Sequence, residues 1–370
     1  MKVPFVDLKA QYLSIKPDID QAIERVISET AFIGGKYVNA FKDDFASIYG
    51  VKHCIPVANG TDAIYIVLKT LGIGLNDEVI TVANSWISTS ETISQAGATP
   101  VFVDVDAYFS IDVTQIEAAI TPRTKAIIPV HLYGQMVDIE AIKEICDKHN
   151  LFLIEDCAQS HFSELKGIRA GWSGIASTFS FFPGKNLGAY GDAGAIVTNN
   201  DELAEKMRMY ANHGALVKHQ HQIEGINSRL DGLQAAILSA KLPYILEWTA
   251  KRRECAQRYD QILADIPQVE LPKVRPDSLH SYHLYVIKVE NREKLAAFLK
   301  EQGIETFIHY PTPLPFMEAY RYLGKTAAHF PAVARNQSLI LSIPIFPELT
   351  LAQQNHVATA IRAFYSTPKQ

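Results

Sequence analysis

Lys185 is the residue whose type and position could carry the most specific chemistry in this sequence. It follows an apolar, aromatic run from Thr178 to Phe182 that breaks at Pro183 and Gly184 and continues into a glycine-rich turn. Burial at the end of such a run would lower the pKa of the amine and make it a usable nucleophile. A lysine in this setting can hold an aldehyde cofactor as a Schiff base.

A carboxylate that could serve the same cofactor follows a second apolar run. Asp156 comes directly after Leu151 to Glu155, and a buried anion there could keep the pyridine nitrogen of pyridoxal phosphate protonated. A helix N-cap or a hydrogen-bonded structural aspartate is an equally simple interpretation. Gln159, three residues further on, could contact the ring hydroxyl, although its type and position also fit a surface amide.

Residues that follow predicted strands are also candidates for binding the phosphate and stacking on the cofactor ring. Gly60 and Thr61 lie between a strand and a helix, where glycine allows close approach and the following amides open the helix. Ser180 is a second candidate hydroxyl for the phosphate. Trp86 follows another strand and could stack on the cofactor ring. An ordinary N-cap and a core tryptophan are the alternatives for these two segments.

Two rival motifs fail on their spacing. Lys185 is followed by Asn186, and the first glycine position of a P-loop holds Phe179, so a Walker A motif is excluded. Gly72 and Gly74 precede a strand instead of following one, which is the wrong order for a dinucleotide fingerprint. The scattered histidines show no spacing typical of metal ligands, and we expect no metal.

The elements that must position these residues alternate along the first two-thirds of the chain. Continuously apolar strands followed by helical patterns predict an α/β fold with a mainly parallel seven-stranded sheet and helices on both sides. We expect this large cofactor-binding domain over residues 1–247 and a smaller α+β domain over residues 248–370. The sequence predicts strands near 54–58, 78–82, 100–105, 125–130, 151–155, 176–182 and 195–198, and then near 282–289, 305–310 and 339–342.

Composition excludes several classes of function. A net charge of -5 gives no electrostatic reason to bind nucleic acid or an anionic membrane. The basic run Lys251-Arg252-Arg253 is predicted to lie on a solvated helix face. The four cysteines are scattered without a CxxC pair, which favours a reducing, cytoplasmic location. No apolar stretch has the length of a signal peptide core or of a membrane span.

Together these segments resemble the sugar aminotransferases of the DegT/DnrJ/EryC1/StrS family, which are pyridoxal phosphate enzymes of fold type I. The resemblance covers nearly the whole chain, and its motifs are specific in combination. They are Val3 to Leu8, Asn59 to Ala63, Asp77 to Thr81, Ala98 to Asp104, Glu155 to Ser160, Ser180 to Gly188, His213-Gly214, Asn227 to Asp231 and His309 to Pro311.

The resemblance implies a role for each matched position. Lys185 would hold the cofactor and move the proton, and Asp156 would pair with the pyridinium. The remaining cofactor contacts would come from Gly60, Thr61 and Ser180 at the phosphate, from Gln159 at the ring oxygen, and from Trp86, which replaces the usual phenylalanine or tyrosine. Substrate contacts would come from Arg229, His309 and Tyr310.

Asn227 would reach the phosphate of the neighbouring subunit, so the resemblance implies a homodimer with shared active sites. Gly184, Asn212 and the segment around Trp86 depart from the usual family pattern, which bears on substrate details more than on the reaction type.

The implied reaction is a ping-pong transamination from L-glutamate to a keto-sugar carried on a nucleotide, making an amino-sugar for surface polysaccharide, lipopolysaccharide or glycoside biosynthesis. The segment Asn227 to Asp231 resembles that of members acting at sugar C-3, which favours a 3-keto sugar linked to dTDP or UDP. The alternatives are a 4-keto acceptor and a dehydratase or lyase on the same cofactor. A dehydratase of this family carries histidine in place of Lys185. A regulator that keeps the fold without turnover is the third class.

Overall fold

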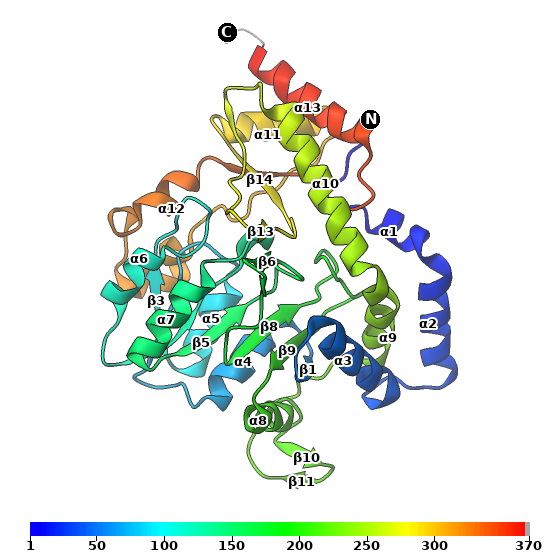
Figure 1. Cartoon of the computed structure of the whole chain (residues 1–370), viewed down its shortest axis with the longest axis vertical. Helices are drawn as coiled ribbons and strands as arrows, with labels where there is room; N and C mark the ends of the chain where they lie inside the picture. The colour runs from blue at the N-terminus through cyan, green and yellow to red at the C-terminus, as the bar shows by residue number, and fades with distance from the viewer. Residues whose placement is uncertain (367–370) are drawn as a thin grey trace.

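The computed structural model describes residues 1–366, and a seven-stranded sheet forms the centre of its wider lower part (Figure 1). The strand order is β1-β9-β8-β5-β4-β2-β3, and β9 alone runs antiparallel to its neighbours. This confirms the predicted mainly parallel sheet. The strands are β1 (His53–Val57), β2 (Glu78–Val82), β3 (Thr99–Val103), β4 (Thr124–Ile128), β5 (Phe152–Asp156), β8 (Ala176–Ser180) and β9 (Gly194–Thr198).

Helices cover both faces of this sheet, which is why its strands can be apolar on both sides. On one face, buried residues of β1, β2 and β9 pack against α4 (Gly60–Thr70), α5 (Ser88–Ala96) and α8 (Asp201–Ala211). On the other face the packing partners are α3 (Gly35–Tyr49), α7 (Ile139–His149) and α9 (Gly232–Lys241). Because the strands other than β9 run in the same direction, their carboxyl ends lie at one edge of the sheet.

A second hydrophobic core lies above this edge in the view of Figure 1. It packs the antiparallel sheet β12-β14-β15 against three helices, and Val3 from the N-terminal segment joins it. The elements are β12 (Val269–Glu270), β14 (Tyr285–Val289), β15 (Ile340–Ile343), α10 (Ile245–Leu263), α11 (Arg292–Glu301) and α13 (Leu351–Ser366). Because α10 passes through the expected boundary, a division between residues 247 and 248 stays a prediction.

The strand expected over residues 305–310 is not formed. That segment makes one isolated bridge, between Phe307 and Ser342, and a second bridge joins the preceding residue Ile304 to Val3. Its side chains instead line the cavity described below, and Phe307 is 53% exposed. The remaining helices and strands are α1 (Leu8–Ser14), α2 (Lys16–Ser28), α6 (Val113–Ile116), α12 (Pro331–Asn336), β6 (Glu164–Leu165), β7 (Ile168–Arg169), β10 (Ala215–Val217), β11 (Gln220–His221) and β13 (Ser278–Leu279).

Within residues 1–366, no helix combines the length and the apolar character that crossing a membrane requires.

Candidate active site

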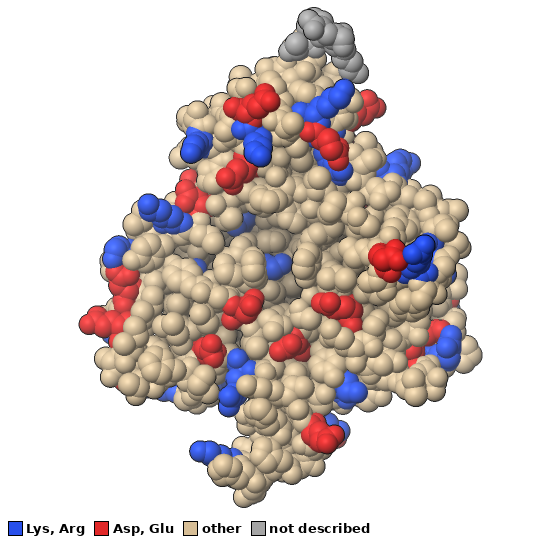
Figure 2. Space-filling model, turned by 180° about the vertical axis from the view of Figure 1, so that it is seen from behind, with Lys and Arg blue, Asp and Glu red and all other residues tan. Residues whose placement is uncertain are grey.

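A cavity of about 720 Å³ lies where the carboxyl ends of the strands meet residues of the second core. Figure 2 shows the surface hollowed near the centre of the face opposite to that of Figure 1, with a basic side chain in the hollow. Nine of the residues singled out from the sequence line the cavity: Gly60, Thr61, Trp86, Asp156, Gln159, Ser180, Lys185, His309 and Tyr310. Asn227 and Arg229 do not line it; both are exposed elsewhere on the chain.

Lys185 reaches the cavity from a tight loop that follows β8. The Lys185 amide donates to the carbonyl of Phe182 at 2.8 Å, and the Ala189 amide donates to Phe181 at 2.8 Å. A Cβ on Gly188 would lie 2.3 Å from the carbonyl oxygen of Pro183, so only glycine allows this close approach. Burial lowers the pKa of Lys185 to about 8, although the nearby Asp156 carboxylate opposes the shift.

Asp156 is the last residue of β5 and is buried at the base of the cavity. One carboxylate oxygen accepts a hydrogen bond from the Ala158 amide at 3.1 Å, and the other accepts from the Thr89 hydroxyl at 2.9 Å. Burial raises the pKa of Asp156, while these two donors and Lys185 act in the opposite direction. A buried carboxylate held in this way can pair with a cationic ring nitrogen.

Gln159 is buried, which removes the surface-amide interpretation. Its side-chain oxygen accepts from the Tyr133 amide at 2.8 Å, and its nitrogen donates to the Tyr310 hydroxyl at 3.0 Å. The Tyr310 ring lies 5.7 Å from the ring of Trp86, which is itself 57% exposed at the cavity wall. The hydrogen bonds fix the Gln159 amide in the lining that also contains Asp156, and the exposed Trp86 ring can cover a planar ligand.

The turn between β1 and α4 forms a cradle for an anion. Asn59 caps α4 by accepting from the Asp62 amide at 2.8 Å, so the first helical amides open toward the cavity. A Cβ on Gly60 would lie 2.8 Å from the Ser180 Cβ, which shows how closely the two segments approach. The Thr61 hydroxyl lies 2.7 Å from the Ser88 hydroxyl. Helix N-termini with adjacent hydroxyls bind phosphate, and the residues present fit this group.

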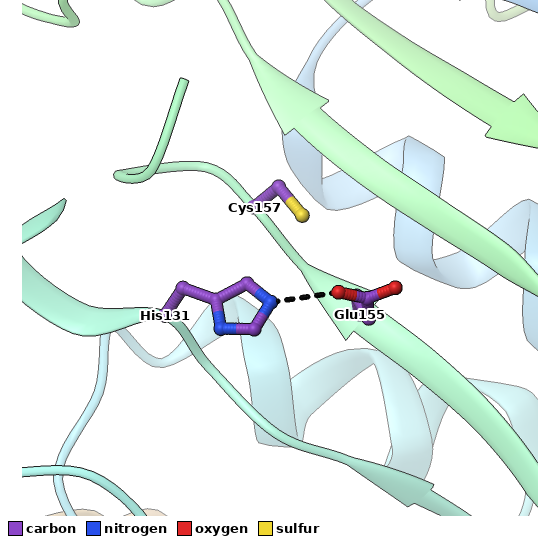
Figure 3. A group of neighbouring side chains, drawn as sticks. All are labelled: His131, Glu155 and Cys157. Carbon is purple, nitrogen blue, oxygen red and sulfur yellow. Dashed lines mark hydrogen bonds and ion pairs between the residues drawn. The ribbon is translucent and has the colours of Figure 1, made fainter. Parts of the chain in front are cut away.

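Behind Asp156, three buried side chains, His131, Glu155 and Cys157, lie close together (Figure 3). Glu155 accepts from His131 Nε2 at 2.9 Å and from the amides of Gly171, Ser173 and Gly174 at 2.9, 2.8 and 2.7 Å. His131 Nδ1 accepts from a backbone amide, which places its remaining proton on Nε2. The hydrogen bonds of His131 and Glu155 are made within the protein and fasten the end of β5. The absence of a metal stays a prediction.

A second lysine also has an altered environment. Lys241 on α9 is buried, its amine donates to the Gly188 carbonyl at 2.7 Å, and it lies 4.2 Å above the Tyr190 ring. Burial lowers the pKa of Lys241 to about 8. Lys241 does not line the cavity; it holds the loop that carries Lys185.

Several residues that line the cavity were not identified from the sequence, and the predicted environment of Arg252 was wrong. Arg252 was expected on a solvated helix face, but it is 4% exposed and lines the cavity. Its position repeats the buried stripe of α10, at Trp248, Cys255 and Tyr259, and this spacing could have revealed it. His283 also lines the cavity, and no pattern in the sequence distinguishes it from other histidines.

Comparison with known proteins decides the family. The model of the DegT/DnrJ/EryC1/StrS aminotransferase family matches residues 13–362. The chain belongs to this family. Its members use pyridoxal phosphate, and the cradle, the buried carboxylate and the lysine of the cavity fit that cofactor.

Individual relatives match over nearly their whole lengths. The chain is 46% identical to a "pleiotropic regulatory protein" of Geobacillus stearothermophilus, covering 99% of each. It is 44% identical to the dTDP-3-amino-3,6-dideoxy-alpha-D-galactopyranose transaminase of Aneurinibacillus thermoaerophilus, covering 98% of this chain and 99% of that one. It is 42% identical to the UDP-2-acetamido-2-deoxy-3-oxo-D-glucuronate aminotransferase of Pseudomonas aeruginosa, covering 97% and 99%.

Among solved structures, the crystal structure of DesV from S. venezuelae in complex with a ketimine intermediate superposes with a TM-score of 0.96. That comparison has 38% identity and covers 100% of both chains. The fold-type expectation drawn from the sequence is therefore confirmed.

Proposed function

We propose that this aminotransferase moves an amino group from L-glutamate to the carbonyl carbon of a 3-keto sugar carried on dTDP or UDP. The products are 2-oxoglutarate and the 3-amino sugar nucleotide, and atoms balance over the two half-reactions. The observation that carries the proposal is the placement of Lys185 and Asp156 in one cavity of a chain belonging to an aminotransferase family.

The residues of the cavity would then divide between holding the cofactor and moving the proton. Pyridoxal phosphate, when bound, stores the amino group between the two half-reactions. Gly60, Thr61 and Ser180 would hold its phosphate, and Asp156 would hold positive charge at the ring nitrogen. Lys185 Nζ would take the proton from the donor's α-carbon and later release it. This proton transfer needs an amine with a pKa near neutrality.

The acceptor is proposed from two supports. Relatives at 44% and 42% identity carry names of enzymes for a dTDP-linked 3-amino sugar and a UDP-linked 3-oxo sugar. The segment from Asn227 to Asp231 resembles that of C-3 enzymes. Assaying purified enzyme with 3-keto and 4-keto sugar nucleotides tests the choice. We expect turnover of the 3-keto isomer, and turnover of only the 4-keto isomer would contradict it.

We also propose that the active site is completed by a second copy of the chain. Asn227 is exposed outside the cavity of its own chain, with its backbone bridged to Asn212, so it is free to face a partner. Sedimentation of the holoenzyme should give a dimer, and Asn227→Ala should weaken cofactor binding without unfolding the chain. A fully active monomer would refute the shared site. A cytoplasmic location stays a prediction.

A further inference from the structure

Arg252 is a buried cation in the wall of the active-site cavity, and the Glu348 carboxylate influences it only from beyond ion-pair distance. All of its hydrogen bonds leave from Nη1, to the carbonyl oxygens of Tyr282, His283 and Ile345 at 3.1, 3.4 and 3.0 Å. It forms no ion pair with any carboxylate among residues 1–366, whereas its neighbour Lys251 pairs with Glu247 at 2.7 Å. A buried charge without a directly bonded counter-ion is costly, so an anion at the free edge of the guanidinium would be bound favourably.

The unused part of the guanidinium has the shape of a carboxylate receptor. Nε is buried without a hydrogen-bond partner, and Nη2 donates to no residue of the described chain. The Nε and Nη2 hydrogens form one edge of the planar fork, which matches the two oxygens of a carboxylate. Burial lowers the pKa of Arg252 to about 10, although the Glu348 carboxylate opposes the shift, so the group remains charged at neutral pH.

Apart from the phosphate cradle at the start of α4, the other ionisable groups of the described cavity wall suit an anion less well than Arg252 does. Burial lowers the pKa of His309 to about 4 and that of His283 well below its ordinary value, so both rings are neutral near pH 7. Lys185 is the amine that would hold the cofactor and move the proton. Arg252 therefore supplies the permanent positive charge in the part of the lining that the described residues form.

The surroundings of Arg252 suit a small organic anion. Leu284 and Ile345 line the same wall and give methylene groups an apolar surface. The phosphate cradle belongs to a different segment, at the start of α4. A dicarboxylic amino acid combines a short methylene chain with carboxylates and must approach Lys185 to react.

We propose that Arg252 binds a carboxylate of the amino-acid donor and of the keto acid left after transfer. This inference rests on the proposed function, because it assigns the donor subsite of the same cavity. It makes Arg252 a specificity-determining residue for the donor half-reaction and predicts little effect on the sugar half-reaction.

Glutarate, a dicarboxylate without an amino group, is the probe. Titration calorimetry on the holoenzyme should show glutarate binding about 10- to 100-fold weaker in Arg252→Gln than in wild type, since a charged hydrogen-bond pair is lost. Arg253→Gln, one residue away and half-buried, should bind as wild type does. Unchanged glutarate binding by Arg252→Gln would overturn the inference.

Two further measurements separate the remaining outcomes. Binding of dTDP and UDP to Arg252→Gln should match wild type, and an equal loss for these nucleotides would assign Arg252 to the diphosphate instead. If Arg252→Gln does not fold, a crystal structure of the wild-type holoenzyme with glutarate decides. A carboxylate on the Arg252 guanidinium is expected, and glutarate bound elsewhere would refute it. Failure of wild type to react with L-glutamate would count against the proposed function alone.

Discussion

The amine of Lys185 should titrate far below an ordinary lysine. Burial lowers its pKa from the usual 10.5 to about 8. At pH 7 the neutral, nucleophilic fraction is then about 9%, against about 0.03% at the ordinary value, a gain of about 300-fold. The Asp156 carboxylate raises the pKa of Lys185, so Asp156→Asn should move it further down.

Stopped-flow mixing of apoenzyme with pyridoxal phosphate, followed by absorbance between pH 6 and 10, measures this pKa. The rate of cofactor attachment should rise with pH to a plateau with a midpoint near 8, and Lys185→Arg should lose this phase. A midpoint near 10.5 would refute burial as the cause. A higher midpoint in Asp156→Asn would contradict the assigned direction of the charge effect.

The packing around the site leads to further predictions. Glu155→Gln should lower the free energy of unfolding by about 2–4 kcal/mol in urea, because a fully buried carboxylate with five donors loses its charge. The exposed control Glu205→Gln should change it by less than about 0.5 kcal/mol. Burial alone would raise the pKa of Glu155, but His131 and the backbone amides hold it below its ordinary value, so its contribution to stability should be present at neutral pH and lost as the pH falls through that lowered pKa. A stability unaffected by Glu155→Gln would contradict the network. Gly60→Ala should weaken pyridoxal phosphate binding about 10-fold or more, because the added Cβ would lie 2.8 Å from the Ser180 Cβ; Gly74→Ala, whose Cβ would meet nothing closer than 3.4 Å, is the matched control. Equal cofactor affinity in the two glycine variants would show that the close approach at Gly60 is not needed.

The sheet and most of the cavity could be predicted because parallel strands bring their carboxyl ends to one edge. Lys185, Asp156 and Gly60 each follow a strand that the apolar pattern identifies, so their meeting needs only the sheet order. The specific hydrogen bonds could not be predicted. The Thr89 hydroxyl on Asp156 depends on how α5 sits on the sheet, which sequence spacing does not determine.

Two segments beside the second core were harder to predict because their residues also line the cavity. Residues 305–310 were predicted to form a strand, yet four of them line the cavity. Arg252 belongs to a run of three basic residues that reads as a charged surface, although its helical position places it on the buried stripe. In both cases the sequence pattern did not indicate that the side chains line the cavity.

Mapping the cofactor attachment tests the central claim most directly. The holoenzyme would be reduced with borohydride, digested, and the pyridoxyl-labelled peptide identified by mass spectrometry. Label on Lys185 is expected, and prior treatment with L-glutamate should abolish it as the cofactor takes up the amino group. Label on Lys241, a fully buried lysine whose pKa is also about 8, would contradict the assignment, as would a label on Lys185 that persists after L-glutamate.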